Sequence, residues 1–186
     1  MGETQKNDLG DWVHKMIKLK SLLLEANLQS LVAKATEYLY AELLKHDIED
    51  KVTVKIKPFK PVHQKHWLMM YKGGTALRGG RPIFWVNDRF LKLVVDYMGD
   101  ALDALVVLKD SMVHEYGHVI YEWANWRKSN DENASKAMYL LKSFGDEEKY
   151  AENFAFFISG RDRSKANVHK KIIDLYKHSV GTETYG

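Results

Sequence analysis

Two histidines one helical turn apart mark the part of this sequence that is suited to chemistry. They belong to the run His114-Glu115-Tyr116-Gly117-His118, which fits the pattern HExxH. Residues four apart in a helix lie on the same face, so both imidazoles can bind one metal ion. Glu115 lies beside them, where a carboxylate can accept a proton. The motif therefore predicts a metal centre with a candidate general base.

The residues around the motif predict that it lies on a largely buried helix. Apolar side chains precede and follow it, namely Ala101, Leu102, Ala104, Leu105, Val106, Val107, Leu108, Met112, Val113, Val119, Ile120 and Trp123. Burying two imidazoles and a carboxylate is costly unless a cation offsets the cost. This setting favours a metal site over histidines that reached the spacing by chance.

Two histidines do not complete a catalytic zinc site, which typically has three protein ligands and a water molecule. The chain has no cysteine, so the third ligand must be His, Asp or Glu. The candidates downstream of the motif are Glu147, Glu148, Glu152 and His169. Helical spacing puts Glu148 and Glu152 on one face with Ala151 and Ala155, and such small residues allow another helix to approach closely.

The motif and this acidic run together resemble the gluzincin metallopeptidases, in which a Glu from a second helix completes the HExxH site. The resemblance depends on the motif and on the run Glu148-Lys149-Tyr150-Ala151-Glu152-Asn153-Phe154-Ala155, and it covers about residues 83–158. The chain is similar here to the ImmA/IrrE peptidases and to the catalytic domain of anthrax lethal factor. A strand that ends at Val86-Asn87 also matches their layout. The resemblance implies a zincin-like fold and a zinc metalloendopeptidase.

The resemblance also implies a role for each matching residue. His114, His118 and Glu148 would bind Zn²⁺, with Glu152 as the runner-up for third ligand. Glu115 would be the general base, and Glu152 would hold the second ring nitrogen of a ligand histidine. Glu147 is expected to be a solvated charge in the first turn of its helix.

The expected reaction is hydrolysis of a peptide bond. Zinc lowers the pKa of its bound water, and Glu115 accepts the proton as the water attacks the carbonyl. Related enzymes often use a nearby Tyr or His to stabilise the oxyanion. We expect Tyr139 in this role, with Tyr121 and Tyr150 as competitors, and Phe144 stands near the place of the catalytic Tyr in the lethal-factor-like pattern. The alternative is a zincin-fold regulatory or protein-interaction module that binds zinc without proteolysis.

Apolar periodicity predicts an α+β fold, with helices around a small mixed sheet of three to four strands, in a single domain over residues 1–186. The expected helices cover 8–46 (one or two helices), 89–98, 100–127, 136–142, 147–158 and a terminal segment around 168–176. The expected strands cover 51–57, 66–71 and 81–87, with Asp88 and Asp100 as caps and 129–135 as a polar linker. The strand at 83–86 is either an edge that pairs with a peptide substrate or an ordinary interior strand.

Composition narrows the choice of partners. The net charge is only +3, from 28 basic and 25 acidic residues, which argues against a nucleic-acid partner. Charges interrupt every apolar run well before 18 residues, and the start of the chain lacks the features of a signal peptide. We therefore expect a cytoplasmic protein that acts on a peptide or protein, with no membrane partner.

Overall fold

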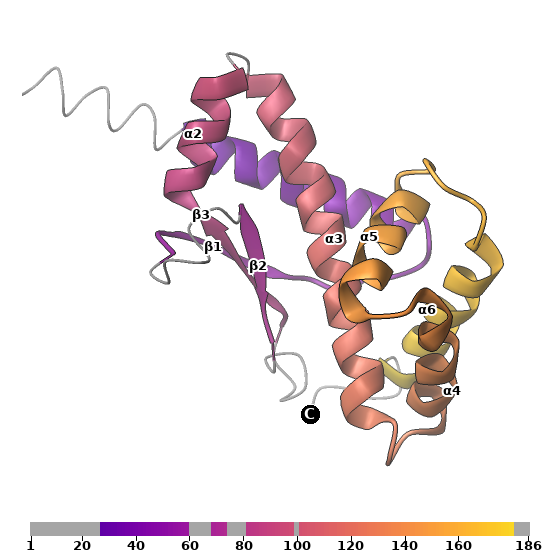
Figure 1. Ribbon diagram of the computed structural model, residues 1–186. Coiled ribbons are helices and arrows are strands. Elements are labelled where there is room, and N and C mark those ends of the chain that lie inside the picture. Colours follow the sequence, from indigo (N-terminus) through magenta and orange to yellow (C-terminus); the bar gives the residue numbers. More distant parts are fainter. Residues whose placement is uncertain (1–26, 60–67, 74–80, 99–100, 181–186) are drawn as a thin grey trace, which may run out of the picture.

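A small mixed sheet and one long helix, α3, organise the fold (Figure 1). The computed structural model describes residues 27–59, 68–73, 81–98 and 101–180. The expected cap Asp100 and the start of the predicted N-terminal helix lie outside these residues. In the described part the class is α+β with three strands, as predicted.

The sheet has the order β1-β3-β2, so that β3 is its central strand. β1 (Thr53–Lys57) runs parallel to β3 (Ile83–Asn87), whereas β2 (Met69–Lys72) is antiparallel to it. Phe84 and Val86 of β3 are fully buried. The possibility that β3 is a substrate-binding edge is therefore wrong, and the edge strand that packs against α3 is β2.

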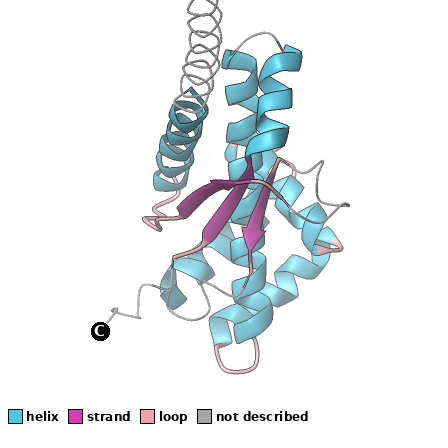
Figure 2. Ribbon diagram, turned by 90° about the vertical axis from the view of Figure 1, so that its left-hand side faces the viewer, coloured by secondary structure: helices cyan, strands magenta, loops and turns pink. Residues whose placement is uncertain are grey.

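The helices surround α3. The described part of the first helix covers residues 27–44 and touches α3 through Thr36 and Met112. α2 (Asp88–Met98) follows the sheet directly, and α3 (Ala101–Arg127) then runs past β2. α4 (Glu132–Leu141), α5 (Glu147–Ile158) and α6 (Ala166–Val180) lie on the other side of α3 from the sheet, and Figure 2 shows the sheet in front of the helices.

Two helix starts differ from the prediction because of local capping. Asp131 accepts hydrogen bonds from the N–H groups of Asn133 and Ala134, so α4 begins at Glu132, inside the expected linker. Asp88 is already the first residue of α2, and the preceding Asn87 side chain accepts from the N–H of Phe90. In both cases an Asx side chain one residue before the helix satisfies its first free N–H groups.

Among the described residues, no helix combines the length and apolarity that crossing a membrane needs.

Candidate metal centre

α3 brings the two motif histidines together on one face. The Nε2 atoms of His114 and His118 lie 3.2 Å apart, and both rings line the same pocket. Tyr116, between them in sequence, points the opposite way and is fully buried, donating to Asp50 Oδ2 over 2.6 Å. The motif therefore has a chemical face and a structural face.

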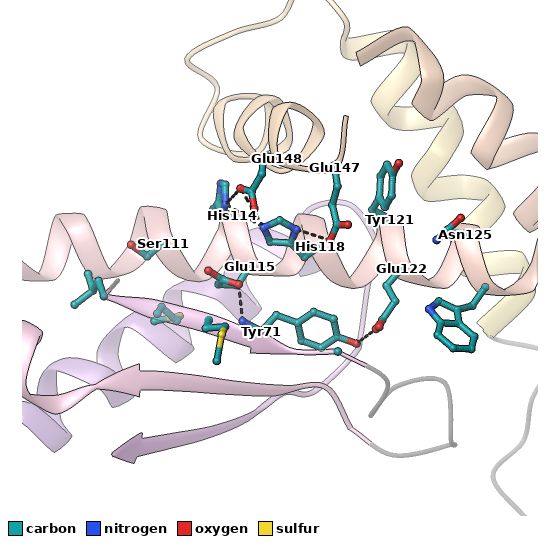
Figure 3. A pocket seen from close by; sticks show the side chains of 15 residues that line it. Tyr71, Ser111, His114, Glu115, His118, Tyr121, Glu122, Asn125, Glu147 and Glu148 are labelled. Carbon is teal, nitrogen blue, oxygen red and sulfur yellow. Dashed lines mark hydrogen bonds and ion pairs between the residues drawn. The ribbon is translucent and has the colours of Figure 1, made fainter. Parts of the chain in front are cut away.

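The third donor comes from the first turn of α5. Asp146 caps this helix by accepting from the N–H of Lys149, and Gly117 of α3 packs against Ala151 of α5. Glu148 Oε2 lies 3.4 Å from His114 Nε2 and 3.6 Å from His118 Nε2 (Figure 3). Gly117 and Ala151 have almost no side-chain bulk, which is why α5 can carry Glu148 this close to α3.

These three donors fit a tetrahedral metal ion. Zinc bonds of about 2.0–2.1 Å place neighbouring ligand atoms of a tetrahedron about 3.3 Å apart. The three distances between the donors His114, His118 and Glu148 run from 3.2 to 3.6 Å. A divalent cation would also offset the repulsion between the lone pairs of the two Nε2 atoms at this distance. The cluster could thus hold a metal ion.

Glu147, not Glu152, contacts the second ring nitrogen of a motif histidine. Glu147 Oε1 lies 2.8 Å from His118 Nδ1, whereas Glu152 is exposed. A carboxylate at this distance keeps the proton on Nδ1 and leaves the lone pair on Nε2 for a metal. The expectation that Glu147 is only a solvated charge is not what the structure shows, because one of its oxygens faces His118.

The surroundings of the two histidines shift their pKa values in opposite directions. Burial lowers the pKa of His114, and the neighbouring His118 lowers it further. Burial also acts to lower the pKa of His118, but the hydrogen bond to Glu147 and the charges of nearby glutamates outweigh it, so the pKa is raised. Because a metal-binding imidazole must be neutral, the lowered pKa of His114 favours metal binding, whereas an ion at His118 would have to displace a proton that the glutamates favour.

Glu115 points to the other side of α3, toward the sheet (Figure 3). Its Oε2 accepts a hydrogen bond of 2.6 Å from the backbone N–H of Tyr71 in β2. Burial raises the pKa of Glu115 to about 7, against the charge of His118 and the Tyr71 hydrogen bond, which lower it. A carboxyl group with a pKa near neutrality can take up and return a proton.

The pocket extends along α3 beyond the histidines. Besides the residues above, its lining includes Tyr121, Glu122, Asn125 and Trp126 of α3 and residues 68–71 and 73 at the edge of the sheet. The hydroxyl of Tyr71 donates to Glu122 Oε2, a second contact between β2 and α3. The described lining contains four glutamates, with no lysine or arginine.

Three other predicted candidates lie away from this pocket. Tyr139 is on α4, with 76% of its surface exposed, and does not line the pocket. Tyr150 is fully buried, and its hydroxyl has no hydrogen-bond partner among the described residues. His169 is buried on α6 between aromatic rings, stacked on Phe157 at 4.8 Å, and is not part of the His114 cluster. Of the tyrosines considered for the oxyanion, only Tyr121 lines the pocket.

Two pocket residues were missed from the sequence. Glu122 lies two helical turns after Glu115, so its position on the face of Glu115 was predictable. Tyr71 was not, because its contact with α3 depends on how the sheet docks against the helix.

The chain matches no known family model, and comparisons with curated proteins and with solved structures gave no match either.

Proposed function

We propose that this protein is a zinc metallopeptidase of zincin-like fold. The observation that supports it most is the convergence of His114 Nε2, His118 Nε2 and Glu148 Oε2 within 3.6 Å, in a pocket that Glu115 also lines. Two imidazoles and one carboxylate are a typical protein ligand set for catalytic zinc, and they leave one position open. The acidic run on α5 supports the gluzincin subclass.

When bound, zinc supplies a Lewis acid that acidifies water and polarises a carbonyl group. Glu115 has a matching task. Its Oε2 is held by Tyr71, and its Oε1 accepts no hydrogen bond from the described residues, which leaves this oxygen to take the proton of a water molecule. The same carboxyl group can pass the proton to the leaving amine.

The pocket also offers a place for a peptide backbone. β2 is an edge strand of the described sheet, and its outer side faces the metal centre. An extended peptide would pair with this strand by main-chain hydrogen bonds, which tolerate different side chains. This gives β2 the substrate-binding position that the sequence left open for β3.

The developing oxyanion needs a donor, and Tyr121 is the tyrosine that we assign to this position. It lines the pocket one turn before Asn125, and its neighbours include Glu147, whose charge together with burial raises the pKa of Tyr121. A raised pKa keeps the phenol protonated, as a hydrogen-bond donor must be.

The test combines metal content and hydrolysis. Purified protein should hold about one zinc ion per chain, and a His114→Ala/His118→Ala variant should hold none. Zinc-loaded wild type should cleave an unfolded protein such as β-casein, whereas Glu115→Gln should retain zinc and lose cleavage. Zinc binding without cleavage would favour an interaction module instead, and a wild type that takes up no zinc would refute the metal centre.

A further inference from the structure

Tyr71 makes two contacts with α3, on either side of His118 in sequence. Its N–H donates to Glu115 Oε2, and its hydroxyl donates to Glu122 Oε2. The two glutamates are seven residues apart, two helical turns, and therefore share one face of α3. One residue of β2 thus sets how the edge strand lies along the motif (Figure 3).

The strand register shows which backbone groups of β2 face away from the sheet. Asn87 N–H donates to the carbonyl of Leu68 over 2.9 Å, so the pair of Leu68 and Asn87 is hydrogen-bonded. In an antiparallel ladder such pairs alternate with pairs whose N–H and C=O groups point outward. The register Met69 to Val86 and Tyr71 to Phe84 makes Met69 and Tyr71 the outward residues of β2.

Glu115 therefore occupies one of only two outward N–H groups within this strand. A peptide that adds to β2 needs an outward N–H for each of its facing carbonyls. The N–H of Tyr71 cannot make a full hydrogen bond to the Glu115 carboxylate and to a peptide carbonyl at once. A docked peptide carbonyl and the Glu115 carboxylate therefore compete for one hydrogen-bond donor, the N–H of Tyr71.

We propose that Tyr71 is a positioning residue that couples peptide docking to the release of Glu115. This inference rests on the proposed peptidase function. In the free protein the N–H of Tyr71 holds the Glu115 carboxylate against β2. A docked peptide takes over this N–H through one of its carbonyls, and the carboxylate turns with both oxygens available to the metal centre. The hydroxyl bond to Glu122 keeps Tyr71 in place during the exchange.

The coupling predicts that Glu115 weakens peptide binding, because the peptide must displace a charge-assisted hydrogen bond. Two inactive variants of similar size and equal charge isolate this effect. Glu115→Gln retains an oxygen that accepts from Tyr71, whereas Glu115→Met has none. Zinc-loaded Glu115→Met should bind fluorescein-labelled β-casein about five-fold more tightly than Glu115→Gln, the effect of one hydrogen bond.

Amide exchange supplies a readout that needs neither substrate nor activity. The N–H of Tyr71 should be protected in wild type and in Glu115→Gln, and should exchange much faster in Glu115→Met. Protection restored by casein in the Met variant would show that the peptide takes the same N–H.

The outcomes separate the two proposals. Equal casein binding by the Gln and Met variants would overturn the coupling and leave the peptidase intact if wild type cleaves. Casein binding by no variant, together with no cleavage by wild type, would overturn both. Equal exchange of the Tyr71 amide in the two variants would show that Glu115 does not hold it.

Discussion

Gly117 and Ala151 are in contact through their backbones. A Cβ on Gly117 would lie 2.7 Å from Ala151 Cα, closer than any real contact, so α5 rests directly on α3 in the middle of the HExxH motif. This contact sets the height at which Glu147 and Glu148 meet the two histidines. Gly117 is therefore needed for the packing of α5 on α3, whereas metal binding by itself would allow other residues at this position.

Gly117→Ala is expected to weaken zinc binding and the fold. The added methyl group meets backbone rather than a movable side chain, so overpacking of about 1–3 kcal/mol should exceed the gain of about 1 kcal/mol in helix propensity. Urea unfolding and a zinc titration measure both effects. Ala151→Gly is the control, because it loses helix propensity and leaves room for α5. Unchanged zinc affinity in Gly117→Ala would contradict this account.

The three glutamates of α5 should differ sharply in their effect on zinc. Glu148→Gln removes a proposed ligand and should cause the largest loss of affinity. Glu147→Gln weakens the support of His118 Nδ1 and should cost about 10- to 100-fold. Glu152→Gln should have little effect, because that side chain is exposed. Competition with a chelating dye measures all three, and a loss confined to Glu152→Gln would restore the original assignment.

His169 should make stability depend on pH. Burial, and to a smaller extent the charge of the nearby Lys165, lowers its pKa from 6.5 to about 4. Between these values the unfolded chain binds a proton that the folded chain does not. The contribution of neutral His169 to the free energy of unfolding is therefore complete above pH 6.5. It falls as the pH drops toward 4, by about 3 kcal/mol in total. His169→Phe should lose this part of the dependence, as followed by urea unfolding at pH 7 and pH 4.5. An equal loss of unfolding free energy between pH 7 and pH 4.5 in the two proteins would refute the buried neutral state of His169.

Tyr71→Phe removes the hydroxyl bond to Glu122 and should impair peptide hydrolysis at unchanged zinc affinity. Tyr40→Phe is the control, since the Tyr40 hydroxyl donates to the carbonyl of Val52 and accepts from its N–H, away from the pocket. Tyr71→Phe should lose about 1 kcal/mol of unfolding free energy, and Tyr40→Phe at least as much. Only Tyr71→Phe should change KM, because only there does the lost bond hold β2 in the pocket. A similar change of KM in both variants would point to a general loss of stability.

Local signals account for what the sequence could predict. Apolar spacing and turn residues placed α3 and α5 nearly at their observed bounds, and four-residue spacing put His114 and His118 on one face. The sequence assigned Glu152 to the second nitrogen of a motif histidine and took Glu147 as a solvated charge. The observed contact of Glu147 with His118 was missed because it depends on how far α5 is rotated and shifted over Gly117. The contact of Tyr71 with Glu115 depends on the order of the strands. It joins residues 44 apart in the sequence, so the spacing of residues along the chain does not predict it.

The exposure of Glu148 bears on how fast the centre would exchange its ion. Its side chain is 76% exposed, whereas that of His118 is only 11% exposed. Solvent therefore reaches the three donors from the side of Glu148. An ion would enter and leave by first gaining or losing this outermost carboxylate. Exchange should then follow the fraying of the first turn of α5, and a stronger cap there would slow the off-rate without a new ligand.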